Sequence, residues 1–264
     1  MLLNGTVGKI GDNISCNEAF LREITSAIVQ KRKRTRAPSS SYSPSGMNCI
    51  RQMYYKRRKV VPEQDTTVYT DVGMADTGTS RHETIQEVLV WMTQHGSRFK
   101  YIDVDRYIEE KQKRGKLLNI VVEGKSGAET KLHDSKRDIR FRCDGIIYDS
   151  RTKEFYLFEF KNQISSSAVG KACVDMKHHC QVDCYGALLD LNKAFVLYEN
   201  RDTCQLYLPE IYEIKEYNKL SILKKIDDCE YAARHGVVPD KPTNLSPSDC
   251  RWCQYKKQCK LDSK

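Results

Sequence analysis

The sequence predicts an α/β fold in which a mixed β-sheet is flanked by helices. Runs of strand-forming residues alternate along the chain with segments of helical periodicity. Two of these runs flank the polar sequence SRTK at residues 150–153, which is typical of a β-hairpin. Strands and helices that alternate around one hairpin indicate a sheet with both parallel and antiparallel pairs. The 264 residues suffice for one large domain or two small ones.

Five segments carry apolar residues at helical spacing, and some are bounded by residues that start or stop helices. Ser45 is the expected N-cap of the second segment, and Gly96 and Gly236 end the third and the fifth. His82 lies near the start of the third segment. The polar residues 62–77 are expected to form a loop. The expected helices are residues 17–33, 46–58, 80–96, 168–190 and 216–235.

Five segments rich in β-branched and aromatic residues are expected to form strands. The second and third of them build the hairpin around SRTK. The polar residues 126–136 are expected to form a loop before the hairpin. The expected strands are residues 118–123, 139–149, 154–162, 194–199 and 205–214.

The positive charge is concentrated near the N-terminus. The chain has a net charge of +9, and its first 60 residues contain 12 Lys or Arg against 3 Asp or Glu. Two basic runs, KRKRTR at 31–36 and KRRK at 56–59, supply most of it. A single basic run is typical of a solvated helix end, but two together favour the phosphate backbone of DNA. The candidate DNA contacts are Lys31, Arg32, Lys33, Arg34, Arg57 and Arg58.

No apolar stretch approaches the roughly 18 residues that a membrane span requires. The N-terminus also lacks the basic start and the apolar core of a signal peptide. The sequence therefore predicts a soluble, cytoplasmic protein without a membrane partner. Its cysteines number eleven, and an odd count in a reducing compartment favours free thiols over disulfides.

Two acidic residues and a lysine lie in the expected hairpin. Because side chains alternate along a strand, Glu159 and Lys161 share one face, and Asp144 lies across the hairpin from Glu159. Two neighbouring carboxylates repel unless a cation lies between them, and Mg²⁺ or Mn²⁺ suits such oxygen ligands. A metal beside an ammonium group suits phosphodiester hydrolysis, with the lysine orienting water. The competing interpretation is a cross-strand salt bridge on a solvated face.

Four cysteines have metal-ligand spacing. Cys250, Cys253 and Cys259 form the pattern C-x2-C-x5-C close to the C-terminus, and Cys49 is the candidate fourth ligand. Four thiolates suit a tetrahedral zinc ion and a [4Fe–4S] cluster equally well. Either group would join the two ends of the chain and reduce the entropy of the unfolded state.

The hairpin residues resemble the signature of the PD-(D/E)xK nuclease superfamily. Asp144 followed by Glu159-Phe160-Lys161 matches the signature, although Cys143 stands where the family often has proline. The resemblance implies a restriction-endonuclease-like core, with Asp144, Glu159 and Lys161 as catalytic residues.

Further motifs resemble the RecB-like branch of this superfamily. His82 is similar to the helical metal-binding histidine of that branch, and Gln181 with Tyr185 is similar to its Q-x3-Y motif. The resemblance implies that Gln181 and Tyr185 position DNA. The implied metal ligands are His82, Asp144, Glu159 and the backbone carbonyl of Phe160.

The cysteine arrangement resembles that of the iron–sulfur nucleases of the AddB and CRISPR-associated (Cas-four) type. The sequence around Cys49, YSPSGMNCIRQMYYKRR, is also similar to the stretch that carries their first cysteine. This resemblance implies that Cys49, Cys250, Cys253 and Cys259 bind a [4Fe–4S] cluster rather than zinc.

Together these resemblances imply a Mg²⁺- or Mn²⁺-dependent DNA exonuclease for recombination, repair or CRISPR adaptation. Any helicase activity would come from a partner protein, because the chain has no Walker-type loop. The alternative is a non-catalytic iron–sulfur or zinc DNA-binding subunit of a larger complex. The expected organisation is a basic helical region (1–60), a RecB-like core (61–236) and a cysteine-cluster segment (237–264).

Overall fold

The computed structural model describes residues 16–32, 39–63, 69–126, 129–163, 173–243, 245, 250 and 253–263. The chain divides into two compact units. The first comprises Met1–Ala37 and Thr66–Thr77, and the second comprises Pro38–Asp65 and Gly78–Lys264. These boundaries differ from those of the three expected segments, because α2 (Ile50–Arg57) packs against α6 (Glu216–His235) within the second unit.

The first unit contains α1 (Cys16–Arg32) and the beginning of α3 (Tyr69–Gln94). α1 confirms the helix expected at residues 17–33. The loop expected at residues 62–77 is wrong from Tyr69 onward, where the chain is helical. This stretch has a glycine and no apolar stripe, but Thr77 Oγ1 donates to the Gly73 carbonyl at 2.9 Å, as a helical turn allows. His82 therefore lies in the middle of α3 rather than near the start of a helix.

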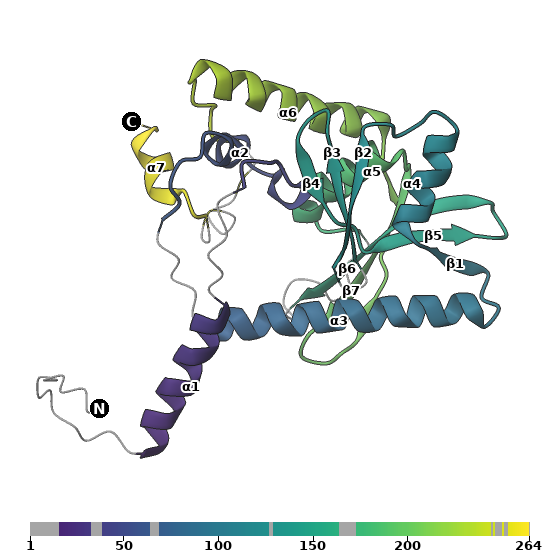
Figure 1. The fold of residues 1–264 in the computed structure, drawn as a ribbon, viewed down its shortest axis with the longest axis horizontal. Coiled ribbons are helices and arrows are strands. Elements are labelled where there is room, and N and C mark those ends of the chain that lie inside the picture. Colours follow the sequence, from purple (N-terminus) through teal and green to yellow (C-terminus); the bar gives the residue numbers. More distant parts are fainter. Residues whose placement is uncertain are drawn as a thin grey trace, which may run out of the picture. The chain divides into compact units, whose positions relative to one another are not determined.

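The second unit is built on a six-stranded sheet (Figure 1). Its strands lie in the order β1 (Phe99–Ile102), β5 (Gly145–Asp149), β6 (Glu154–Gln163), β7 (Lys193–Asn200) and β8 (Leu206–Tyr207), and β9 (Tyr212–Glu213) also pairs with β7. The β6–β7 pair is parallel, whereas β1–β5, β5–β6, β7–β8 and β7–β9 are antiparallel. The predicted α/β fold with a mixed sheet is confirmed.

Helices cover both faces of this sheet, with α3 and α6 on opposite sides (Figure 1). On one face, Ile85 and Leu89 of α3 pack around Phe160 of β6. On the other face, α5 (Met176–Leu189) packs against β6, and α6 packs against α5. Because side chains alternate along β6, Phe160 faces α3 while Glu159 and Lys161 face α5. The candidate site therefore receives side chains from both sides of β6.

A separate antiparallel sheet consists of β2 (Ile120–Ser126), β3 (Glu129–Asp134) and β4 (Ile139–Phe141). β3 lies in the segment expected to be a loop, so that expectation is wrong. Its buried side chains are Thr130, Leu132 and Asp134. Two of these are polar, and the strand therefore lacks the apolar alternation that would predict it.

The strand expected at residues 139–149 is two strands in the structure. β4 pairs with β3 in the small sheet, whereas β5 pairs with β1 and β6 in the large one. The chain passes from one sheet to the other through residues 142–144. Asp144 thus lies immediately before β5, at the junction of the two sheets.

Proline accounts for two further differences. Pro44 begins a 3₁₀ turn, η1 (Pro44–Gly46), so that α2 starts only at Ile50, with Cys49 in an extended conformation as its N-cap. Ser45 is therefore not the cap of α2. Pro209 lies between β8 and β9, and because proline has no N–H to donate, the strand expected at 205–214 is interrupted there.

The C-terminal helices follow the expectation more closely. α6 confirms the helix at 216–235 and ends at Gly236, which has the left-handed φ of 68° that favours glycine. α5 confirms the second half of the helix at 168–190, of which residues 168–172 lie outside the described residues. α4 (Val104–Lys113) and α7 (Lys256–Leu261) are additional helices. No described helix is long and apolar enough to cross a membrane.

Candidate functional site

The register of the β5–β6 hairpin brings the two predicted carboxylates together. Gly145 pairs with Phe158, so Asp144 and Glu159 are the next residues in the same register. The backbone N–H of Phe160 donates to Asp144 Oδ2 at 2.7 Å. Both carboxylates are buried, with Asp144 5% and Glu159 3% exposed. The hairpin therefore holds two acids beside each other and away from bulk solvent.

α3 contributes His82 to the same place. His82 Nδ1 lies 2.9 Å from Asp144 Oδ1, and its ring packs edge-on against Phe160 with ring centroids 5.0 Å apart. One helical turn further, Gln86 Nε2 donates to the Asp144 carbonyl at 2.7 Å, which fixes α3 against the hairpin. Burial alone would lower the pKa of His82, but the hydrogen bond and charge of Asp144 outweigh burial and raise the pKa.

Glu129 is a site residue that the sequence did not indicate. Among the described residues, the one group of three His, Cys, Asp or Glu side chains whose ligand atoms lie within 4.8 Å of one another is His82, Glu129 and Asp144. Glu129 begins β3, the strand that was expected to be a loop. Arg142 Nη1 donates to Glu129 Oε2 at 3.0 Å and restrains its carboxylate. Glu159, an expected ligand, is not part of this group.

Glu159 instead belongs to an adjacent polar cluster with α5. Lys161 Nζ donates to Glu159 Oε1 at 2.6 Å and to Gln181 Oε1 at 2.9 Å. Gln181 Nε2 donates to Glu159 Oε1 at 2.9 Å and to the Tyr185 hydroxyl at 3.1 Å. The helical spacing of Gln181 and Tyr185 thus places both side chains at the site. There the Gln181 side-chain amide holds Lys161 and Glu159 in place.

One oxygen of Glu159 has no protein partner. Glu159 Oε2 is buried and accepts no hydrogen bond within the described part of the chain. Burial, followed by the charge of Asp144, raises the pKa of Glu159 above its ordinary value. A buried acceptor without a donor is costly, and a nearby cation would both satisfy it and favour its ionised form. The carboxylates and the imidazole therefore fit a divalent cation such as Mg²⁺ or Mn²⁺.

The four predicted cluster cysteines line one cavity of about 320 Å³ in the second unit. Cys49 precedes α2, and Cys250, Cys253 and Cys259 come from the C-terminal segment. Burial raises the pKa of Cys49 and of Cys253, and the charges of the neighbouring cysteines raise it further. Within the described ranges, no three of these sulfur atoms lie within 4.8 Å of one another.

Arg51 is the buried cation beside this cavity. It is 6% exposed, and it lines the cavity together with three lysines, Lys241, Lys256 and Lys260. Arg51 Nη1 lies 3.7 Å from Cys259 Sγ and 3.3 Å from the Cys259 carbonyl. Its other acceptors are the uncharged Pro239 carbonyl, at 2.7 Å, and Ser263 Oγ, at 2.6 Å. The cavity therefore combines thiol ligands with a positively charged lining.

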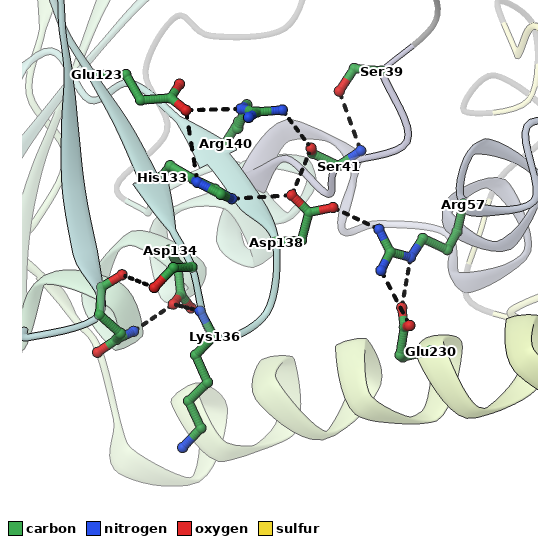
Figure 2. Close-up of polar contacts among 12 residues, drawn as sticks. Ser39, Ser41, Arg57, Glu123, His133, Asp134, Lys136, Asp138, Arg140 and Glu230 are labelled. Atoms are coloured by element: carbon green, nitrogen blue, oxygen red, sulfur yellow. Dashed lines mark hydrogen bonds and ion pairs between the residues drawn. The ribbon is translucent and has the colours of Figure 1, made fainter.

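The predicted DNA contacts differ in availability. The Arg57 guanidinium is held by Asp138 Oδ2 and by Glu230 Oε2, each at 2.7 Å, as Figure 2 shows. It joins α2 to α6 and to the β3–β4 turn, so its charge is not free for a phosphate. Arg58 is exposed, and its Nη1 donates to the Ala233 carbonyl at 3.3 Å. Lys31 is exposed near the end of α1, whereas the side chain of Arg32 and the whole of Lys33 and Arg34 lie outside the described residues.

Glu123, in β2, takes part in the same network (Figure 2), and it is not in the metal-ligand group. Arg140 Nε donates to Glu123 Oε1 at 3.2 Å, and His133 Nδ1 lies 3.7 Å from the same oxygen. The second nitrogen of His133 lies 3.1 Å from Asp138 Oδ1. This carboxylate thus belongs to a structural network between β2, β3 and β4.

Comparison with known proteins yields little. No protein-family model matches the chain. None of the curated proteins matches it. A solved structure described as "Crystal structure of SSO0001" aligns over 93% of this chain and 96% of that chain, with a TM-score of 0.46 and 14% sequence identity. At this similarity the alignment carries no conclusion about the fold or the function.

Proposed function

We propose that this chain is a metal-dependent deoxyribonuclease of the PD-(D/E)xK type. It acts as an exonuclease on DNA ends, from a restriction-endonuclease-like core. The observation that carries the proposal is the convergence of His82, Asp144 and Glu129 ligand atoms within 4.8 Å, next to the Glu159–Lys161 pair. Binding alone does not need three acids and a lysine at one point, whereas phosphodiester hydrolysis does.

Four elements contribute ligands to the proposed Mg²⁺ or Mn²⁺ site. His82, Asp144 and Glu129 hold the cation, together with the free oxygen of Glu159 and the Phe160 carbonyl that the family resemblance implies. A divalent cation held by these residues would polarise the scissile phosphate and lower the pKa of a water molecule. The resemblance implies His82, Asp144, Glu159 and Phe160 as metal ligands. Glu129 is added to this set from the structure.

The remaining polar residues orient the reactants. Lys161 donates from the same face as Glu159 and offsets the negative charge that develops on the phosphate. Gln181 bridges Lys161, Glu159 and Tyr185, so it fixes the direction in which the ammonium points. Because preorganised donors need no reorganisation during the reaction, this bridge contributes to the rate rather than to substrate binding alone. Tyr185 in turn donates to the Arg142 carbonyl at 2.5 Å, which anchors α5 at the junction of the two sheets.

A [4Fe–4S] cluster bound by Cys49, Cys250, Cys253 and Cys259 is part of the proposal. Among the described residues no three of these sulfurs lie within 4.8 Å of one another, which supports a cluster over zinc. A tetrahedral zinc ion with Zn–S bonds of about 2.3 Å would bring the sulfurs to about 3.8 Å from one another. The positively charged lining of the cavity suits a negatively charged group. A metal group bound by four thiolates, whether zinc or a cluster, would carry such a charge.

A helicase or a recombination or CRISPR protein is the proposed partner.

Cleavage of end-labelled single-stranded and double-stranded DNA in Mg²⁺ or Mn²⁺ tests the function. We expect Asp144→Asn to lower the cleavage rate by at least about 100-fold, because the amide is a poor metal ligand and the site loses a charge that the cation requires. EDTA should abolish wild-type cleavage.

The matched control is Glu123→Gln, which removes a nearby carboxylate from the network of Arg140 and His133. This variant should cleave DNA at close to the wild-type rate. Wild-type activity in Asp144→Asn, or an equally large loss in Glu123→Gln, would contradict the site assignment.

A further inference from the structure

A second cavity, of about 440 Å³, lies in the second unit where three segments meet, of which two adjoin in sequence and the third is distant. These segments are the serine-rich stretch before α2, the helix α2 itself and the turn before α7. The stretch contributes Ser43 and Ser45, and α2 contributes Gln52 and Lys56, with Gln254 opposite. We call it the serine–lysine cavity. It contains none of the metal-ligand group and none of the four cluster cysteines.

The lining of the serine–lysine cavity offers hydrogen-bond donors and no carboxylate. No Asp or Glu is among its lining residues. Within the described part of the chain, the hydroxyls of Ser43 and Ser45 and the side-chain amides of Gln52 and Gln254 form no hydrogen bond. They are therefore available to a ligand that accepts several hydrogen bonds at once.

Lys56 is the charged group of the cavity. Its side chain is half-buried, and among the described residues its ammonium group has no ion pair or hydrogen bond. Burial lowers the pKa of Lys56, an effect that the charge of Asp138 only partly opposes. A half-buried ammonium without an ion-pair partner is unfavourable, and a bound anion relieves that cost. The neighbouring Arg57 is neutralised by two carboxylates, whereas Lys56 is not.

We propose that the serine–lysine cavity is a phosphate-binding site that takes a backbone phosphate of the DNA substrate. This inference rests on the proposed function for the source of the phosphate. A phosphate has several acceptor oxygens around one centre, which suits a lysine together with two hydroxyls and two amides. The basic run KRKRTR ends only three residues before Ser39, the first residue that lines the cavity, so the sequence that leads into it also favours a polyanion.

DNA binding without cleavage tests the site. The affinity for a labelled single-stranded oligonucleotide is measured in EDTA over a range of salt concentrations. Lys56→Gln should weaken binding about tenfold and flatten the slope of log affinity against log salt by about 0.7, the value for one phosphate contact on a single strand. Lys56→Gln should melt at or above the wild-type Tm, because it removes an unpaired half-buried charge.

The matched control is Lys59→Gln, which removes the same charge three residues further along the chain. Lys59 is exposed and does not line the cavity, so both the affinity and the slope should stay close to wild type. Ser45→Ala should weaken binding without changing the slope. Equal losses in both lysine variants would mean that Lys56 acts only through general charge, and would overturn the site.

Two further outcomes separate this inference from the proposed function. If wild-type protein cleaves DNA but Lys56→Gln binds it normally, the phosphate site is wrong and the nuclease stands. If wild-type protein cleaves no DNA but binding depends on Lys56, the site stands and the nuclease is wrong. Calorimetric titration with inorganic phosphate distinguishes the source. Lys56-dependent phosphate binding without Lys56-dependent DNA binding would overturn DNA as the ligand.

Discussion

Two buried carboxylates in the second unit, Glu199 and Asp149, are paired with cations from neighbouring elements. Glu199 is 2.9 Å from Arg81, and Asp149 is 2.7 Å from Arg98. Glu159 is only half-satisfied, because Oε1 meets Lys161 while Oε2 has no donor among the described residues; Oδ2 of the buried Asp134, outside the site, also has no donor there. A half-satisfied buried acid destabilises the fold, and such exceptions are expected at functional sites. The spacing of Asp144, Glu159 and Lys161 predicted that these residues meet. It did not predict which carboxylate oxygen remains available to bind a cation.

His178 provides a prediction about pH at the scale of one residue. Burial, followed by the charges of Lys161 and Lys177, lowers its pKa to about 3. The ring stays neutral between Tyr198, whose hydroxyl lies 2.9 Å from Nδ1, and Gln163, which donates to Nε2 at 3.2 Å. In the unfolded chain the pKa is about 6.5, so below this pH the unfolded state binds a proton that the folded state excludes.

Stability should therefore fall as pH drops from about 6.5 towards 3. At pH 5 this residue alone costs about 2 kcal/mol, from about 1.36 kcal/mol per pKa unit over about 1.5 units. Urea denaturation at pH 7 and pH 5 measures the loss. In His178→Gln the difference between the two pH values should shrink by up to this amount. An unchanged difference would show that another group sets the acid sensitivity.

At the scale of elements, local signals predicted α6 better than the elements around Pro44 and Pro209. α6 has a regular apolar stripe and a left-handed glycine at its end, and its bounds follow from these. The beginning of α3 lacks an apolar stripe, and two of the three buried side chains of β3 are polar, so neither element has such a signal. Missing β3 also meant missing Glu129, since a residue assigned to a loop has no defined neighbours. His82, Asp144, Glu159 and Lys161 were found because order and spacing mark them independently of the sheet.

Gly145 tests how the junction between the two sheets is built. Its φ is +158°, and a Cβ atom there would lie 2.4 Å from Cε2 of Tyr101 on the neighbouring β1. Gly145→Ala should therefore force the ring or the strand to move and destabilise the protein by about 1–3 kcal/mol. Because Asp144 is the adjacent residue, DNA cleavage should fall by more than the folded fraction does.

The control for this variant is Gly115→Ala. Gly115 has a left-handed φ, of +73°, but a Cβ atom would meet nothing within 4 Å. Its replacement should cost about 1 kcal/mol through backbone strain alone and leave the specific activity unchanged. Thermal unfolding and cleavage per folded molecule measure both effects. Equal effects in the two variants would show that the close approach to Tyr101 is unimportant.

At the scale of the whole molecule, α2 and the C-terminal segment are held together, and both are far from the β5–β6 hairpin in sequence. Tyr55 donates to Asp262 Oδ2 at 2.6 Å, and Arg51 binds the Cys259 carbonyl and Ser263. The rings of Tyr55 and Tyr255 pack with centroids 5.5 Å apart. The cysteine spacing predicted that these segments meet, whereas Arg51 and the tyrosines could be assigned to the contact only once the fold was known.

The contact should act as a staple that depends on the metal group. Cys49 and Cys259 enclose 259 − 49 = 210 residues of chain, and a cross-link over a loop of this length stabilises by about 5 kcal/mol in the chain-entropy model. Cys253→Ser should lose the iron, the absorption near 400 nm and several kcal/mol of the free energy of unfolding, and its C-terminal segment should become sensitive to protease.

Arg51→Gln should bind iron but release it faster to a chelator, because the thiolates lose their buried counter-charge. Cys173, which is exposed, supplies the control, and Cys173→Ser should keep both iron and stability. If metal analysis of the wild-type protein finds one zinc and no iron, the bound group is zinc rather than a cluster, and the staple still holds. If a metal-free Cys253→Ser protein is as stable as the wild type, the staple itself is refuted.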